Sequence, residues 1–220
     1  PIRSSAASDV YKRQSLWRPW NIDPSWKTQS GQAWFHIDQH PISKPGKQCI
    51  QGLINLLPTS KEIGGNVVIP KSHNFFKDLP QEYKERVERL PLDIDHFRFP
   101  HDDPKLSSEP AVMAHMEPGD MLLWDSRTIH CSSSGSSLPD GTNDLIRAAS
   151  LICMMPKKLS SKEILDKRIH AAENLVSTTN WTNDFRNADE FPIILEAENR
   201  DQYKWPKKPN LSDYQKELIA

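Results

Sequence analysis

The amino-acid sequence predicts a mainly β domain, built as a sandwich or a barrel. Seven short segments have the length of strands and are rich in apolar or β-branched residues: 32–38, 48–57, 66–69, 111–116, 121–125, 127–131 and 145–155. Turns with Gly or Pro separate several of them, such as Gly64-Gly65 and Pro118-Gly119. Many short strands joined by such turns are typical of sandwiches and barrels. A chain of 220 residues is long enough for one such domain with a sizeable core.

Residues 48–57 show the alternation of a strand most clearly. Gln51, Leu53 and Asn55 fall on one face of this segment, and Ile50 and Ile54 fall on the other. The short segment at 66–69 follows the Gly turn and is β-branched, which favours a strand.

Three segments are predicted to be helices: 80–90, 162–176 and 212–218. The first begins with Pro and is rich in good helix formers. The second follows Ser160-Ser161, which caps it, and has Glu163 in its first turn. Residues 91–110 are rich in Pro and Asp and are predicted to form a long loop. Residues 132–144 are dominated by Ser, Gly, Asp and Asn and are predicted to be flexible.

The first 14 residues, PIRSSAASDVYKRQ, differ from the rest of the chain. They show no apolar periodicity and no initiating Met, and they resemble a translated sequencing adapter. We therefore expect 1–14 to be a non-native leader and 15–220 to be a single domain that is incomplete at its N-terminus. An ordinary disordered leader is the alternative.

The charge and hydropathy of the chain exclude some classes of partner. The formal net charge is −1, so no global field favours nucleic acid or an anionic membrane. No apolar run approaches the roughly 18 residues needed to span a bilayer. We expect neither nucleic acid nor membrane as a partner. The last four residues are not a peroxisomal signal, and a cytoplasmic location is the default expectation.

The three cysteines, Cys49, Cys131 and Cys153, are far apart and lack CxxC spacing. A disulfide framework or a zinc ribbon is therefore not expected, and reduced thiols are the default. Cys131 follows His130, but neighbours on a strand point to opposite faces, so we expect Cys131 to lie in the core.

A candidate metal site begins with His36 and Asp38. They are two residues apart on a predicted strand, so both side chains project from one face. His130 lies on a distant predicted strand behind the turn that contains Pro118-Gly119. Two histidines and one carboxylate form the facial triad of non-haem iron(II) oxygenases. An HxD pair alone is a weak signal.

The chain offers two other pairs of this kind. One is His101 with Asp102 and Asp103, and the other is His115 with Glu117. His101 lies between two prolines, where a strand is disfavoured. His115 lies in a predicted strand and remains a competitor to His36 on the residues alone.

Four segments together resemble the phytanoyl-CoA dioxygenase-like family. They are WFHIDQH, QGLINLLPTSKEIGGNVVIPKSH, EPGDMLLWDSRTIHCSS and IRAASL, in this order over about residues 32–155. The resemblance implies a double-stranded β-helix (a jelly-roll, cupin-like fold) with peripheral helices. It also implies a dioxygenase that uses Fe(II), 2-oxoglutarate and O2 on a small organic molecule. We expect the chain to be a monomer.

The same resemblance implies roles for individual residues. His36, Asp38 and His130 match the iron ligands, and Arg147 matches the arginine that pairs with the distal carboxylate of 2-oxoglutarate. A planar guanidinium can grip a carboxylate through two hydrogen bonds. Ser132 matches a hydroxyl that assists that grip. Arg147 lies farther from His130 than in many relatives, and Arg127 is its rival.

The resemblance also bears on neighbouring residues and on the reaction. Leu53 falls where the family has a residue that lines the co-substrate pocket, so Gln51 and Asn55 on its face are also expected to point inward. Relatives that halogenate lack the carboxylate of Asp38, so its presence favours hydroxylation. The fragment itself could be inactive, because segments that precede the HxD pair in relatives are absent.

The sequence is also compatible with three other functions. They are a non-catalytic jelly-roll that binds a metal or a small ligand, a structural β domain without a metal, and a cupin-type enzyme with zinc or manganese. Trp34 and Trp124 are expected in the core, and Asp125 is expected to pair with Arg127.

Overall fold

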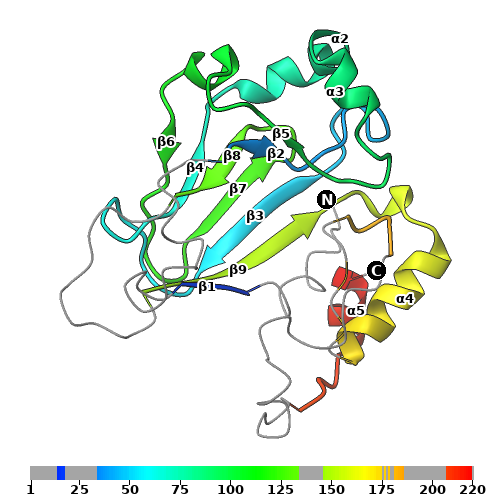
Figure 1. Ribbon diagram of the computed structural model, residues 1–220. Coiled ribbons are helices and arrows are strands. Elements are labelled where there is room, and N and C mark those ends of the chain that lie inside the picture. Colours follow the sequence, from blue (N-terminus) through cyan, green and yellow to red (C-terminus); the bar gives the residue numbers. More distant parts are fainter. Residues whose placement is uncertain are drawn as a thin grey trace, which may run out of the picture. The chain divides into compact units, whose positions relative to one another are not determined.

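The computed structural model describes residues 14–17, 34–133, 146–174, 176, 178, 181–185 and 207–219 (Figure 1). The chain divides into two compact units, one of Ser15–Ala149 and one that joins Pro1–Gln14 to Ser150–Ala220. The expected leader at 1–14 lies outside the described residues except for Gln14, and so does most of the segment at 132–144.

The described strands form two sheets. The first has the order β1 (Gln14–Trp17), β9 (Arg147–Met154), β3 (Ile50–Asn55) and β7 (Met121–Asp125). The second has the order β5 (Phe97–Arg98), β2 (His36–Ile37), β8 (His130–Ser132), β4 (Asn66–Val68) and β6 (Val112–Met113). Helices are few, so the mainly β, two-sheet fold expected for a double-stranded β-helix is confirmed.

An apolar cluster packs on one face of the second sheet, opposite the face that carries His36 and His130. Its buried members are Ile37, Ile69, Phe76, Leu79, Val87, Phe97, Phe99 and Ile129. Phe97 and Phe99 pack edge to face with ring centroids 5.2 Å apart, a favoured aromatic geometry. Because Ile37 and Ile129 come from β2 and from the residue before β8, this cluster holds the two strands of the candidate site from behind.

The helical segment predicted at 80–90 is broken. The structure has α2 (Leu79–Glu82) and α3 (Lys84–Glu88), separated by Tyr83 with φ −115° and ψ 35°. The Tyr83 hydroxyl donates a hydrogen bond to Asp103, and its ring packs against Phe97. These tertiary contacts account for the break, since the helix propensity of the segment is high throughout.

The segment predicted as a loop at 91–110 contains two elements. They are β5 and the 3-10 helix η3 (Pro104–Ser107). The Asp103 side chain caps η3 by accepting a hydrogen bond from the backbone N–H of Lys105 at 3.0 Å. β5 forms because it pairs with β2, with His36 opposite Arg98. Local composition does not show such a partner.

Two strand boundaries also differ from the prediction. The strand expected at 127–131 begins at His130, because a turn occupies the residues before it, with the N–H of Thr128 bonded to the carbonyl of Asp125 at 2.8 Å. Arg127 binds Asp125 through Nε and Nη2, both at 2.8 Å, which confirms their expected pairing. Only Val112–Met113 of the segment at 111–116 pairs as a strand.

The second unit contains η4 (Lys157–Leu159), α4 (Lys162–Glu173) and α5 (Asp213–Ile219). The predicted cap is confirmed, because Ser161 accepts a hydrogen bond from the N–H of Ile164 at 3.2 Å. The fully buried Arg168 donates to the carbonyls of Trp181 and Asp184. A salt bridge of 2.8 Å joins Lys216 of α5 to Glu173 of α4.

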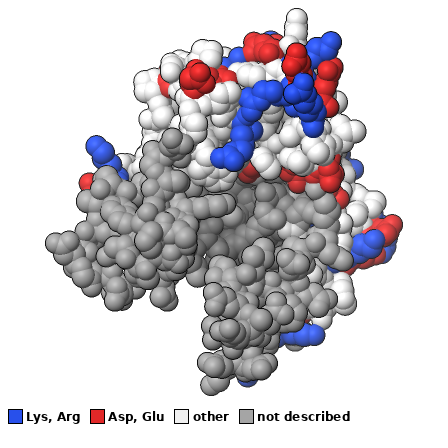
Figure 2. Space-filling model, viewed as in Figure 1, with Lys and Arg blue, Asp and Glu red and all other residues white. Residues whose placement is uncertain are grey.

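The mixed surface charge and the free cysteines are as the amino-acid composition predicts. Basic and acidic side chains lie intermingled on the described part of the face in Figure 2. None of the described helices combines the length and the apolar character that a bilayer crossing requires. Cys49, Cys131 and Cys153 are free thiols, and all three are buried, as expected for Cys131. Burial raises the pKa of Cys131 to about 12, so this thiol stays protonated at neutral pH.

We expect Phe97→Ala to lower the free energy of unfolding by about 3–5 kcal/mol, because it leaves a cavity in the apolar cluster. Phe97 is 2% exposed. Urea unfolding followed by circular dichroism measures the change. Leu92→Ala is the matched control, since Leu92 is 65% exposed, and its effect should stay within about 0.5 kcal/mol. Equal effects of the two substitutions would contradict this account of the core.

Candidate metal centre

His36 and Asp38 are presented on one face by the alternation of β2. His36 is buried, and Ile37 between the two residues is fully buried in the apolar cluster on the other face. Asp38 lies just past the strand, where its backbone N–H donates to the carbonyl of Ser126 at 3.2 Å. The expected geometry of the HxD pair is therefore present, with the apolar residue between the two polar ones anchoring them.

His130 reaches the same place from a remote part of the sequence. β8 pairs antiparallel with β2, and His36 is directly opposite His130 in this ladder. The two imidazole ring centroids are 4.4 Å apart. Ile129 and Cys131 on either side of His130 are buried on the opposite face. Strand pairing alone thus joins two side chains that are 94 positions apart in the sequence.

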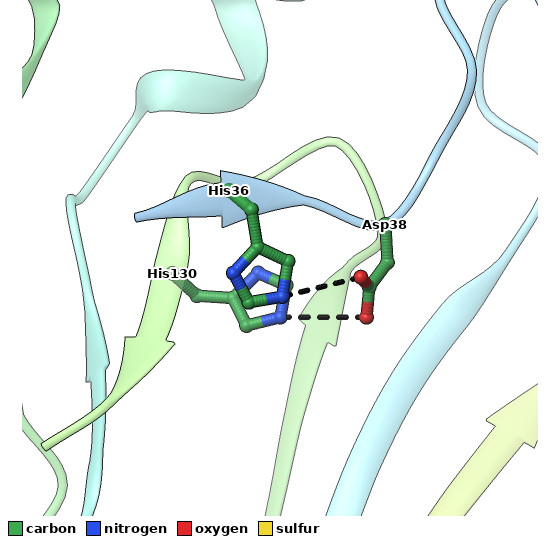
Figure 3. A group of neighbouring side chains, drawn as sticks. All are labelled: His36, Asp38 and His130. Carbon is green, nitrogen blue, oxygen red and sulfur yellow. Dashed lines mark ion pairs between the residues drawn. The ribbon is translucent and has the colours of Figure 1, made fainter. Parts of the chain in front are cut away.

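The three side chains converge on a small volume (Figure 3). His36 Nε2 lies 3.2 Å from Asp38 Oδ1, and His130 Nε2 lies 3.6 Å from Asp38 Oδ2. One ligand atom from each of the three residues lies within 4.8 Å of the other two. Ligand atoms at right angles on a metal with bonds of about 2.1 Å are about 3 Å apart. The spacing therefore suits three ligands on one face of a metal ion.

Hydrogen bonds orient both imidazoles. His36 Nδ1 lies 3.0 Å from the carbonyl of Trp34, and His130 Nδ1 lies 2.9 Å from the carbonyl of Thr128. A carbonyl only accepts, so each Nδ1 carries the proton and a neutral ring has its lone pair on Nε2. Both Nε2 atoms face the Asp38 carboxylate and donate to it when they carry a proton; without that proton, three electron-pair donors surround one point. Such a donor set fits a cation, and the bonded Nδ1 atoms are typical of histidine metal ligands.

Asp38 is held in its charged form. Burial by itself would raise the pKa of Asp38, but hydrogen bonds and charge interactions with His130 and His36 outweigh it and hold the pKa well below the usual 3.8. The side chain keeps 20% of its surface exposed. The carboxylate is thus anionic at neutral pH and is reachable from solvent on one side.

A second group of polar residues lies on β8 and β9. Arg147 is buried and donates from Nη1 to the Ser132 hydroxyl at 3.0 Å. Burial lowers the pKa of Arg147 to about 10, so the guanidinium remains charged at neutral pH. Ser132 shares a face of β8 with His130, two residues before it. The structure therefore brings together the two residues that the resemblance assigns to a carboxylate, next to the triad along β8.

Asn66 is a further polar residue of this group that no motif in the sequence indicates. It is directly opposite Ser132 in the ladder of β4 with β8, and its side chain is 6% exposed. Its amide nitrogen is buried with no hydrogen-bond partner in the described part of the chain. Directly opposed residues on one face have Cβ atoms about 5 Å apart. Asn66 therefore places an amide N–H donor beside Ser132. This position follows from the register of β4 with β8, which has no local signal in the sequence.

Gln51 and Asn55 are buried on one face of β3, as expected. The alternative HxD and HxE pairs are not assembled, because His101 and His115 are exposed and neither belongs to a cluster of metal-binding side chains among the described residues. Arg127, the rival of Arg147, is engaged by Asp125.

The prediction that Trp34 lies in the core is wrong, and Trp124 is only partly buried. Trp34 is 39% exposed and stacks on His36, with ring centroids 4.2 Å apart and planes 5° from parallel. Trp124 is half-buried beside His130 at 5.2 Å and bonds to Gln51. The two indoles therefore flank the imidazoles of the candidate site.

The model of the phytanoyl-CoA dioxygenase family matches residues 4–138 of the chain. The Ava biosynthesis cluster protein O of Aspergillus versicolor is 30% identical over 154 residues, which are 66% of this chain and 47% of that protein. The chain thus spans about half the length of this curated relative.

Two solved structures show a more distant likeness. EvdMO1 is 19% identical with a TM-score of 0.40, over 66% of this chain and 26% of EvdMO1. SnoN, a non-haem α-ketoglutarate-dependent epimerase from nogalamycin biosynthesis, is 16% identical with a TM-score of 0.33, over 56% of this chain and 40% of SnoN. These identities are too low to transfer a substrate or a reaction.

We expect the stability of the metal-free chain to depend on the charge of Asp38. Its pKa in the folded state is lowered, so the stabilisation is present above the unfolded-state pKa of about 3.9 and is lost as the pH falls through the folded-state pKa. The free energy of unfolding of the wild type should therefore fall more steeply from pH 6 to pH 3 than that of Asp38→Asn. Urea titrations with chelator at several pH values measure both, and parallel curves would argue against the charged contact.

Proposed function

The chain belongs to the phytanoyl-CoA dioxygenase family, and on this basis we propose that it is a non-haem Fe(II)- and 2-oxoglutarate-dependent dioxygenase that hydroxylates a small organic molecule. The observation that carries the proposal is the convergence of His36, Asp38 and His130 with both Nε2 atoms directed at the carboxylate. The activity is proposed for the whole protein, because the chain spans about half of its curated relative.

His36, Asp38 and His130 would hold the ferrous ion. Two imidazoles and one carboxylate on one face are the donor set of non-haem iron(II) oxygenases and leave other coordination positions open. No fourth His, Cys, Asp or Glu joins the three within the described residues. The anionic Asp38 offsets one of the two positive charges of the metal, while the carbonyls of Trp34 and Thr128 keep the rings in the binding tautomer.

Arg147, Ser132 and Asn66 would bind the distal carboxylate of 2-oxoglutarate. A buried guanidinium is costly to desolvate, so it gains most from an anionic ligand that restores its lost solvation. Ser132 orients Arg147 through its 3.0 Å hydrogen bond. Asn66 adds a neutral donor from the neighbouring strand. The residues that would hold the co-substrate then include Ser132 on β8, the strand that carries the candidate metal ligand His130.

The residues of the chain would bind and orient the metal and the co-substrate, and would limit the access of water to them. The buried His36 and His130 rings, with the indoles of Trp34 and Trp124 beside them, limit the contact of the metal position with water, which strengthens electrostatic interactions inside the site. Bound iron would supply the redox chemistry that couples decarboxylation of 2-oxoglutarate by O2 to oxidation of the substrate. Hydroxylation is the simplest outcome for a site that retains its carboxylate ligand.

We expect the whole protein to release succinate from 2-oxoglutarate with Fe(II), ascorbate and O2, and to lose this activity on His36→Ala or His130→Ala. The same substitutions should weaken Fe(II) binding by more than about 100-fold. Loss of a residue that merely hydrogen-bonds a metal ligand already lowers metal affinity about 10- to 100-fold. Calorimetry measures binding, and chromatography measures succinate.

His115→Ala and His101→Ala are the controls for the triad substitutions, since both side chains are exposed outside the triad. Full succinate release by His36→Ala would rule out the proposed iron site. Tight binding of metal and 2-oxoglutarate without succinate would instead favour the non-catalytic binding domain.

The co-substrate assignment is tested by binding alone. We expect Arg147→Gln to raise the dissociation constant of 2-oxoglutarate by about 100-fold, and Asn66→Ala by about 10-fold, since hydrogen bonds to charged groups contribute about 1.5–3 kcal/mol. Calorimetry of the Co(II)-loaded protein measures both. Arg127→Gln is the matched control, because Arg127 is paired with Asp125. An unchanged constant for Arg147→Gln would refute the assignment, and absence of 2-oxoglutarate binding by the wild type would favour a cupin-type site without a keto acid.

A further inference from the structure

Gln51 joins the candidate metal centre to the first sheet. Its side chain is 4% exposed and lies between two polar groups. Gln51 Nε2 donates to Asp38 Oδ2 at 3.0 Å, and Gln51 Oε1 accepts from the indole N–H of Trp124 at 3.1 Å. Gln51 and Trp124 are directly opposite in the ladder of β3 with β7. The ladder therefore fixes the indole next to the amide.

The chemistry of the indole sets the orientation of the amide. The two ends of a glutamine amide are almost indistinguishable by shape, so their assignment depends on hydrogen-bond partners. The indole of Trp124 is a donor only, so it must meet the amide oxygen of Gln51. The amide N–H groups of Gln51 must then face Asp38. An ionised carboxylate can accept hydrogen bonds but cannot donate one. Each partner in the chain thus determines the next.

The contact treats the two oxygens of Asp38 differently. Oδ2 accepts the Gln51 N–H, whereas Oδ1 lies 3.2 Å from His36 Nε2. A lone pair engaged by an amide N–H is less available to a metal, and the hydrogen bond resists rotation of the carboxylate. A carboxylate that binds a metal through both oxygens takes up one more coordination position than one that binds through a single oxygen.

We propose that Gln51 is a positioning residue that holds Asp38 for coordination through Oδ1 alone, and that Trp124 fixes the orientation of the Gln51 amide. This inference rests on the proposed function, because it takes Asp38 as a metal ligand. It explains why a buried amide, which is costly without partners, stands on β3. It also gives Trp124 two roles, since its ring packs 5.2 Å from His130 while its N–H holds Gln51.

Titration of the chain with Co(II) tests the proposal without turnover. We expect Gln51→Leu to raise the dissociation constant for Co(II) by about 10-fold or more, as for other outer-shell contacts, and to change the visible absorption of the bound ion. Trp124→Phe keeps the aromatic ring beside His130 but frees the Gln51 amide, so it should shift both quantities in the same direction by less.

Asn55→Leu is the matched control. Asn55 is a buried amide on the same face of β3, but it bonds to Thr59 rather than to Asp38. We expect its Co(II) affinity and spectrum to equal those of the wild type. A structural role of Gln51 would instead lower the melting temperature of the metal-free protein and leave the Co(II) spectrum unchanged.

Three results would overturn the inference. Wild-type affinity and spectrum in Gln51→Leu would remove the positioning role while leaving the metal site intact. If Gln51→Leu does not fold, a wild-type spectrum in Trp124→Phe would remove it equally. Absence of Co(II) binding by the wild type would instead refute the proposed metal site itself, and the positioning role with it.

Discussion

The candidate site depends on the antiparallel pairing of β2 with β8, which places His36 opposite His130. Register is a strict constraint because side chains alternate along a strand, so a slip of one residue would turn a histidine to the other face. The buried Ile37 and Ile129 oppose such a slip, since it would bring them out of the apolar cluster. The same burial that stabilises the sheet therefore also fixes the donor atoms in space.

Much of this arrangement could be predicted from the sequence because it is local. The alternation of a strand is enough to place His36 and Asp38 on one face, and the same rule buries Cys131 behind His130. The choice of His130 as their partner came from resemblance, because strand pairing over long distances leaves no local pattern. The neighbouring prolines argue against His101, but His115 could be separated from His36 only by its exposure, which the fold determines.

The rest could not be predicted, for reasons that are also physical. β5 lies in a segment rich in Pro and Asp and exists because β2 offers it a partner. The break at Tyr83 comes from contacts with Asp103 and Phe97, which outweigh a strong helical propensity. Trp34 is apolar and was expected in the core, but its ring lies flat on His36 and remains partly exposed. In each case a tertiary partner decides the outcome.

The charges of the site explain why its two halves belong together if the proposed function holds. Asp38 carries one negative charge and Arg147 one positive charge, so the site alone is neutral. A ferrous ion alone would leave two uncompensated positive charges, and a dianionic keto acid alone would leave two negative charges. Uncompensated charge in a buried site is costly, whereas the two ligands together restore neutrality. Each should therefore bind more tightly in the presence of the other, and the coupling is reciprocal by linkage.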